Sequence, residues 1–360
     1  IATALAVAGD VTLQASAQQY GGFTIPEIDN IFAPYAARSF KKHQETLSKI
    51  SNDQERIDEL AIEMTIREIE QGIQGFETKL NTVSSSLGQI PFVTITFGLN
   101  TSFWGREISK ALLNNRLRGI GADKTTAIFP KLVMLMRSEI NRDEDAPNKD
   151  IYDLAVQCSA KRLYPDYLSF DGADKGNNLA QVYERSGKTV SPMGCRAYLS
   201  PYFNGDEEIY LGRGNMGAVS LNLPKIALEA DHDLEKFYKL IDHYTRLIWK
   251  FHKNYRDKVG KQKGSTNPLF YCEGGAWKSV GYEDEIAPVI EAFTSSLGYI
   301  GLEETVQALT GNSLLHNQDL ALEIVSYLKK NVEQAEIDYG MQTALYSTPA
   351  EGYCYKAQDS

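Results

Sequence analysis

The stretch Pro91-Phe92-Val93-Thr94-Ile95-Thr96-Phe97-Gly98 decides the fold class. Its β-branched and aromatic residues, ended by a glycine, predict a buried strand. A long amphipathic helix is predicted before it, over residues 53–84, and another helix follows at 106–118. A second strand is predicted within 126–136, where Pro130 requires a bulge or a strand that begins after it. Strands that alternate with helices favour an α/β architecture, either layered or closed into a barrel.

Helices and strands continue to alternate along the rest of the chain. Residues 164–191 are the exception, because they are polar and glycine-rich and are predicted to form loops. The sequence shows no internal repeat and no linker long enough to separate domains, so one domain over residues 1–360 is expected. Further helices are predicted at 2–19, 151–163, 226–258, near 283–296, 303–309 and 320–336, and further strands at 208–211, 217–223 and 342–347.

The composition excludes several classes of protein. The chain has 360 residues, of which 42% are hydrophobic and 23% charged, as is typical of a globular protein. Its net charge of -10 and pI near 5.2 argue against binding to nucleic acid, because a phosphate backbone requires a basic surface. The apolar start, residues 1–11, is too short to cross a membrane and is predicted to be a buried helix. Neither a nucleic acid nor a membrane is expected as a partner.

The four cysteines, Cys158, Cys195, Cys272 and Cys354, are far apart and form no CxxC pair. This spacing predicts neither a zinc site nor a disulfide framework, and it fits a reducing cytoplasm. The five histidines show no metal-binding pattern either, so no metal site is predicted. Cys158 and Cys272 are most simply explained as buried structural residues.

Cys195 is the first candidate for chemistry. It lies in Pro192-Met193-Gly194-Cys195-Arg196, on a predicted turn with a glycine on one side and a cation on the other. A thiol in such surroundings is often reactive, because a nearby cation stabilises the thiolate. From the local sequence alone, however, a buried and inert cysteine is the favoured interpretation.

Two further segments have sufficient structural explanations. Gly212-Arg213-Gly214-Asn215-Met216-Gly217 precedes a predicted strand, whereas a dinucleotide-binding loop opens a helix, so a hairpin turn is favoured. In Thr348-Pro349-Ala350-Glu351, Thr348 caps a predicted helix and Glu351 completes a capping box. The functional alternative is that this helix N-terminus holds phosphates or places the Glu351 carboxylate in a cleft.

Taken together, these segments resemble the class III anaerobic ribonucleotide reductase family, whose members are glycyl radical enzymes. The resemblance extends over nearly the whole chain, and eight segments in the family's order are hard to obtain by chance. It implies a ten-stranded α/β barrel, incomplete here, with an interior finger loop. The matching segments are 19–26, 97–101, 127–132, 158–166, 192–196, 212–215, 220–224 and 348–351.

The resemblance also implies a role for individual residues. Cys195 would become the thiyl radical that abstracts the 3' hydrogen of the ribose, and Met193 matches a methionine beside that cysteine in members that use formate. Asn215 would form hydrogen bonds in the substrate cavity. Tyr346 and Glu351 would line the same cavity, with Glu351 relaying the proton needed for loss of the 2' hydroxyl. The residues expected to bind substrate are Gly194, Ser347 and Thr348.

The family's other parts are expected outside this chain. The glycyl radical and a four-cysteine zinc site would lie downstream, and a second active-site cysteine and an ATP-binding module would lie upstream. The chain alone, a single catalytic barrel domain, is therefore expected to be inactive. The resemblance further implies ribonucleoside triphosphate substrates, formate as reductant and a radical SAM iron-sulfur activase. ATP and dNTP effectors would bind at a homodimer interface that involves the helix at 106–118.

Two alternatives remain open at this point. The first is another glycyl radical enzyme, of the pyruvate formate-lyase type, which shares the barrel and the loop cysteine. The second is a truncated, catalytically inactive paralogue that binds nucleotides. Retention of Cys195, Asn215 and Glu351 together argues against the second alternative.

Overall fold

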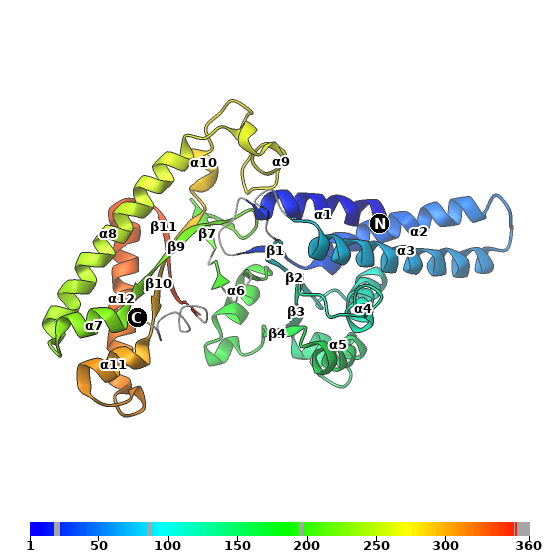
Figure 1. Ribbon diagram of the computed structural model, residues 1–360. Coiled ribbons are helices and arrows are strands. Elements are labelled where there is room, and N and C mark those ends of the chain that lie inside the picture. Colours follow the sequence, from blue (N-terminus) through cyan, green and yellow to red (C-terminus); the bar gives the residue numbers. More distant parts are fainter. Residues whose placement is uncertain are drawn as a thin grey trace. The chain divides into compact units, whose positions relative to one another are not determined.

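The computed structural model describes residues 1–17, 22–84, 88, 90–193, 197–199, 201–348 and 350. The chain divides into two compact units, residues 1–200 (unit 1) and 201–360 (unit 2). Figure 1 labels their helices and strands. Each unit has its own parallel sheet and its own apolar core. The predicted α/β class with parallel strands is confirmed, while closure into a ten-stranded barrel and the single domain stay predictions.

Unit 1 is built around a four-stranded sheet with the order β1-β2-β3-β4, in which all neighbours are parallel. A short antiparallel hairpin, β5-β6, follows the sheet. The elements are α1 (Ala2–Ser16), β1 (Phe23–Ile25), α2 (Ile28–Leu47), α3 (Gln54–Thr82), β2 (Val93–Phe97), α4 (Phe103–Arg118), β3 (Lys131–Met136), the π-helix η1 (Ser138–Arg142), α5 (Lys149–Arg162), β4 (Asp166–Ser169), η2 (Ala173–Lys175), α6 (Asn178–Ser186), β5 (Pro192–Met193) and β6 (Ala197–Tyr198).

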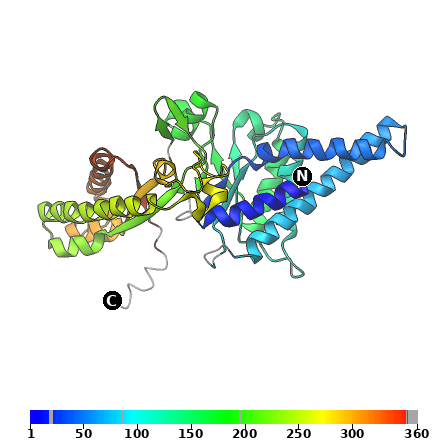
Figure 2. The same ribbon diagram turned by 90° about the horizontal axis from the view of Figure 1, so that it is seen from above.

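The core of unit 1 lies between its sheet and its helices. Val93, Ile95 and Phe97 of β2 are fully buried there, together with apolar residues of α2, α3, α4 and α5. Both long helices, α2 and α3, lie side by side and extend together away from the sheet (Figure 2). The Asp53 carboxylate caps α3 by accepting a hydrogen bond from the Arg56 amide, as its sequence position favours.

A buried ion pair links α3 to α4. The Arg116 guanidinium is fully buried, and its Nε donates to Glu77 Oε1 at 2.7 Å. Asn115 Nδ2 donates to the other oxygen of Glu77, and Arg116 Nη2 donates to the Pro130 carbonyl at 2.6 Å. These contacts connect both helices to the segment that enters β3.

Unit 2 contains a three-stranded parallel sheet in which β10 lies between β9 and β11. Helices α7, α8, α11 and α12 share an apolar core with this sheet. The elements are β7 (Tyr202–Asn204), β8 (Glu207–Ile209), β9 (Asn215–Asn222), α7 (Leu223–Ala230), α8 (Leu234–Gly260), η3 (Gly264–Thr266), α9 (Pro268–Tyr271), α10 (Ala287–Ile290), β10 (Thr294–Ile300), α11 (Leu302–Thr310), η4 (Leu314–His316), α12 (Gln318–Tyr339) and β11 (Gln342–Ser347).

Most of the predicted elements are confirmed. The strand predicted at 91–98 is β2, β3 begins directly after Pro130, and β11 has the predicted bounds. The helices predicted at 53–84, 106–118, 151–163, 303–309 and 320–336 are α3, α4, α5, α11 and α12.

Several predictions of secondary structure are wrong. The predicted loops at 164–191 contain β4, which pairs with β3, and α6, whose start is capped by the Asn177 side chain. The predicted helix at 283–296 is only the four-residue α10, and β10 begins at Thr294. The predicted single helix at 226–258 is two, because Asp231 and His232 adopt positive φ angles of 54 and 63 between α7 and α8.

The ion pair between Glu77 and Arg116 predicts a large effect on stability. Replacing Glu77 by Ala leaves the Arg116 cation buried without its partner and is expected to lower the free energy of unfolding by about 3–5 kcal/mol. The matched control is Glu59→Ala, which removes an ion pair with Arg56 in which both side chains are 61% exposed. That change should cost less than about 1 kcal/mol. Urea unfolding followed by circular dichroism measures both, and equal losses would contradict the assignment.

Candidate active site

The hairpin β5-β6 flanks the predicted radical cysteine. Pro192 pairs with Tyr198 and Met193 with Ala197 in antiparallel register. Three residues connect these pairs in sequence, Gly194, Cys195 and Arg196, and they lie outside the described residues. Met193 is 9% exposed. The strands on either side of Cys195 therefore form a hairpin in unit 1, and β5 lies against β1 and β2. That this hairpin is the interior finger loop stays a prediction.

The glycine-rich segment before β9 is not a hairpin turn. It connects β8 to β9, and these strands pair with β7 and β10, respectively, so the hairpin-turn interpretation is wrong. Arg213 attaches this segment to the beginning of β10 by donating to the Ala292 carbonyl at 3.0 Å and to Thr294 Oγ1 at 3.3 Å. Burial lowers the pKa of Arg213 to about 10, which leaves it charged at neutral pH. The loop thereby fixes Asn215 at the first position of β9.

Two hydroxyl groups meet at the carboxyl end of the sheet in unit 2. Ser220 Oγ and Thr348 Oγ1 are 2.6 Å apart, and the Thr348 amide donates to the Tyr299 carbonyl at 3.0 Å. Between them, Gly298 of β10 leaves no room for a side chain, because a Cβ there would collide with both hydroxyl oxygens. In open α/β sheets, ligands bind beyond the carboxyl ends of the strands. This hydroxyl pair therefore lies where ligands of such sheets bind.

The sheet register determines which predicted site residues come together. Tyr346 lies level with Gly298, and Ser347 and Thr348 follow it at the carboxyl end. Asn215 instead lies level with Thr294, whose partner on β11 is Gln342. Four residues of strand separate that level from Tyr346, or about 13 Å along the sheet. The sheet therefore brings Thr348 to Ser220 but does not bring Asn215 to Tyr346.

Several predicted residues cannot be placed. Gly194, Cys195 and Glu351 lie outside the described residues. A single cavity that joins these residues to Asn215 and Tyr346 stays a prediction. Of the predicted helix whose cap would be Thr348, Ala350 is described, and its φ of 37 is not helical. Gly298 was missed because no strand was predicted around it, and the helix predicted at 283–296 overlaps the first three residues of β10. These residues, Thr294-Ser295-Ser296, are poor helix formers.

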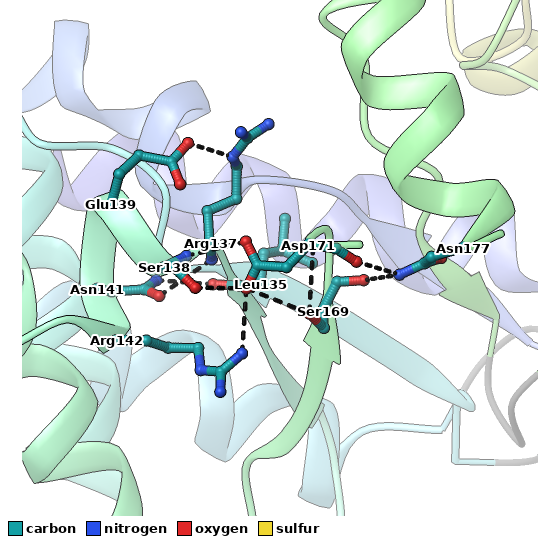
Figure 3. A network of polar contacts seen from close by, with 9 residues as sticks. All are labelled: Leu135, Arg137, Ser138, Glu139, Asn141, Arg142, Ser169, Asp171 and Asn177. Carbon is teal, nitrogen blue, oxygen red and sulfur yellow. Dashed lines mark hydrogen bonds and ion pairs between the residues drawn. The ribbon is translucent and has the colours of Figure 1, made fainter. Parts of the chain in front are cut away.

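The carboxyl edge of the sheet in unit 1 carries a second polar network (Figure 3). The Asp171 carboxylate accepts from the Ser138 amide and hydroxyl, both at 3.0 Å, and from Arg142 at 3.1 Å. Burial alone would raise the pKa of Asp171, but these donors hold it below its usual value. Asn177 donates to the Ser169 and Asp171 carbonyls. Because the carboxylate is already satisfied by the protein, this network ties the loops after β3 and β4 together rather than presenting a ligand site.

The two cysteines that the structure describes differ in burial. Cys158 is fully buried in the core of unit 1, as predicted, and burial raises the pKa of its thiol to about 11. Cys272 is partly buried, and burial raises its pKa as well. Within the described ranges, no three His, Cys, Asp or Glu residues are grouped so that they could hold a metal ion. No helix in the same ranges has the length and apolar character needed to cross a membrane.

A comparison with known protein families identifies the family of this chain. Residues 1–359 match the family model described as anaerobic ribonucleoside-triphosphate reductase. The chain belongs to this family. The match favours the reductase over the pyruvate formate-lyase type of enzyme.

Relatives with the same family name occur in bacteria and in a bacteriophage. The chain is 37% identical to the anaerobic ribonucleoside-triphosphate reductase of Escherichia coli (strain K12), over 98% of this chain and 49% of that protein. It is 36% identical to that of Enterobacteria phage T4, over 99% of this chain and 57% of that protein. The chain thus spans about half the length of these relatives.

Solved structures support the fold. The anaerobic ribonucleotide reductase from Thermotoga maritima with citrate in the active site matches with a TM-score of 0.64 and 15% identity, over 97% of this chain and 59% of that one. The same enzyme in complex with dATP and CTP matches with a TM-score of 0.61 and 15% identity, over 95% of this chain and 53% of that one. Similarity at this level of identity concerns the arrangement of helices and strands.

The hydroxyl pair predicts that residue 298 must be glycine. Gly298→Ala is expected to lower the free energy of unfolding by about 1–3 kcal/mol through overpacking. Adding Ser220→Ala should recover part of that loss, because it removes one of the two colliding oxygens. The control is Gly75→Ala in α3, where a Cβ meets nothing within 4 Å and helix propensity should make the change neutral or stabilising. Thermal unfolding of the parent protein and the three variants measures these changes. If Gly298→Ala left the stability unchanged, the proposed crowding at residue 298 would be refuted.

Proposed function

We propose that the protein containing this chain reduces ribonucleoside triphosphates to deoxyribonucleoside triphosphates under anaerobic conditions, with Cys195 as the thiyl radical. The observation that carries the proposal is the hairpin whose two arms flank Cys195 in a chain that matches the reductase family along its length. The relatives' names support the same reaction, and the dATP and CTP complex of a solved neighbour supports nucleotides as ligands.

The proposed reaction begins at the ribose. The Cys195 sulfur takes the 3' hydrogen, which leaves a carbon radical on the sugar and an S–H bond on the cysteine. Glu351, protonated at the outset, gives its proton to the 2' hydroxyl, which departs as water. Formate gives up two electrons and one proton, which form the new C–H bond at the 2' carbon, and becomes carbon dioxide. The Glu351 carboxylate regains its proton from water. Cys195 then returns the hydrogen to the 3' carbon, so the cysteine is a radical again at the end of the cycle.

The described residues support the binding side of this proposal. The hydroxyls of Ser220 and Thr348 and the exposed Ser347 lie at the strand ends where ligands of α/β sheets bind, and they suit hydrogen bonding to phosphate oxygens. Asn215 lies at the opposite end of the same sheet and would contact a different part of the substrate. Met193, next in sequence to the finger loop tip, would lie beside the reacting sulfur.

The remaining components belong to the same proposal. A glycyl radical on a downstream segment would supply the unpaired electron, after its generation by a radical SAM iron-sulfur activase. ATP and dNTP effectors, a homodimer and a structural zinc site outside this chain are proposed from the family. No zinc ligand is assigned within the described residues, because none of their side chains form a suitable group.

Cys195→Ser in the natural protein that contains this chain tests the radical assignment. Deoxyribonucleotide formation should fall below detection, because a serine oxygen does not form a radical under these conditions. Binding of CTP, measured by calorimetry, should persist. The matched control is Cys272→Ser, which removes a partly buried thiol outside the hairpin and should keep most of the activity. Retained activity in Cys195→Ser would exclude the mechanism.

The reductant is tested separately. With formate as the only reductant, the activated enzyme should convert CTP to dCTP and release labelled carbon dioxide from labelled formate in a one-to-one ratio. Full activity with a thioredoxin system and no formate would eliminate the formate proposal. The assignment of Cys195 does not depend on this result.

A further inference from the structure

The two faces of β2 have opposite chemistry. Val93, Ile95 and Phe97 point into the apolar core, so Thr94 and Thr96 point to the other face of the sheet. Both threonines are 0% exposed. Thr24 of β1 is the register partner of Thr94 and lies on the same face. Strands buried on both faces are usually apolar throughout, so this buried hydroxyl face requires an explanation.

The hydroxyl face, formed by Thr24, Thr94 and Thr96, receives the base of the hairpin. Thr24 Oγ1 donates to the Pro192 carbonyl at 2.5 Å. Thr96 Oγ1 accepts from the Glu27 amide at 2.8 Å and lies 3.3 Å from Ser191 Oγ. Because the Glu27 amide is a donor, the hydrogen of the Thr96 hydroxyl remains available for Ser191.

Thr94 differs from its two neighbours. Its hydroxyl is buried and has no hydrogen-bond partner within the described residues. The three threonines therefore share a sheet face, but among the described residues only Thr24 and Thr96 bond to the hairpin base. A comparison of Thr94 with Thr24 and Thr96 can therefore distinguish the effect of the hydrogen bonds from the effect of side-chain shape.

The hairpin is short, so its own strand pairing contributes little stability. Its arms are two residues each, and isolated two-stranded hairpins are marginally stable even when they are longer. The two bonded residues, Ser191 and Pro192, immediately precede Met193 and lie three to four positions before Cys195. A displacement of Ser191 and Pro192 would therefore also displace the residues that follow them in the chain.

We propose that Thr24 and Thr96 are positioning residues, which anchor the base of the hairpin to the hydroxyl face and so hold Cys195 in place for reaction. The anchoring stands on the hydrogen bonds alone, and its catalytic consequence rests on the proposed function. Displacements of about 1 Å can lower a reaction rate by about 100-fold, so two hydrogen bonds remote from the substrate are sufficient to influence turnover.

The anchoring is tested by hydrogen–deuterium exchange of residues 188–199, followed by mass spectrometry of the natural protein. Thr24→Val and Thr96→Val keep the side-chain shape and remove the hydroxyl, and each should speed exchange in this segment by about fivefold. Thr94→Val is the matched control and should exchange like the parent. Thr24→Ser retains the donor and should restore the parental rate. Unchanged exchange in both anchoring variants, or an equal rise in Thr94→Val, would overturn the anchoring.

Turnover tests the catalytic consequence. Thr24→Val and Thr96→Val should lower kcat for deoxyribonucleotide formation by about 10- to 100-fold and leave KM nearly unchanged, because substrate binding is not altered. Thr24→Ser and Thr94→Val should retain parental kcat. A parental kcat in both anchoring variants would overturn the positioning role. If the parent enzyme shows no reductase activity, the proposed function fails, while the exchange experiment still decides whether the hairpin is anchored.

Discussion

The alternation of side chains along β2 is the constraint on which unit 1 depends. Val93, Ile95 and Phe97 are all buried against helices, and the pleat then forces Thr94 and Thr96 to the opposite face. A slip of one residue would exchange the two sets, placing hydroxyls in the apolar core and large apolar groups against the hairpin base. The same alternation along β2 therefore determines both which residues form the apolar core and which residues contact the hairpin base.

Local patterns in the sequence were sufficient for the elements that are locally determined. The amphipathic period of α3, the β-branched run of β2 and the proline before β3 each identified an element. The strand β10, in contrast, could not be predicted from local patterns. It is central and paired on both sides, so partners distant in the sequence stabilise its small polar residues. The apolar residues before it, at 286, 289, 290 and 293, have helical spacing, yet the helix α10 extends only over Ala287–Ile290.

The candidate site was predictable only in part, for a related reason. The resemblance identified Thr348 and the segment that contains Ser220, but not that their hydroxyls would touch. That contact joins residues 128 positions apart and depends on the pairing of β9 and β11 with the same central strand. Gly298 acquires its importance from that pairing, because crowding by two other strands leaves space for a hydrogen atom only. No pattern local to residue 298 contains this information.

The burial of Cys158 determines how its thiol responds to oxidants. With a pKa of about 11, about one Cys158 side chain in ten thousand is a thiolate at neutral pH. Oxidants attack the thiolate, and the surrounding core excludes them in any case. This thiol is therefore unreactive, and its role is to pack between helices. Oxidation of this protein is therefore expected to start at residues other than Cys158.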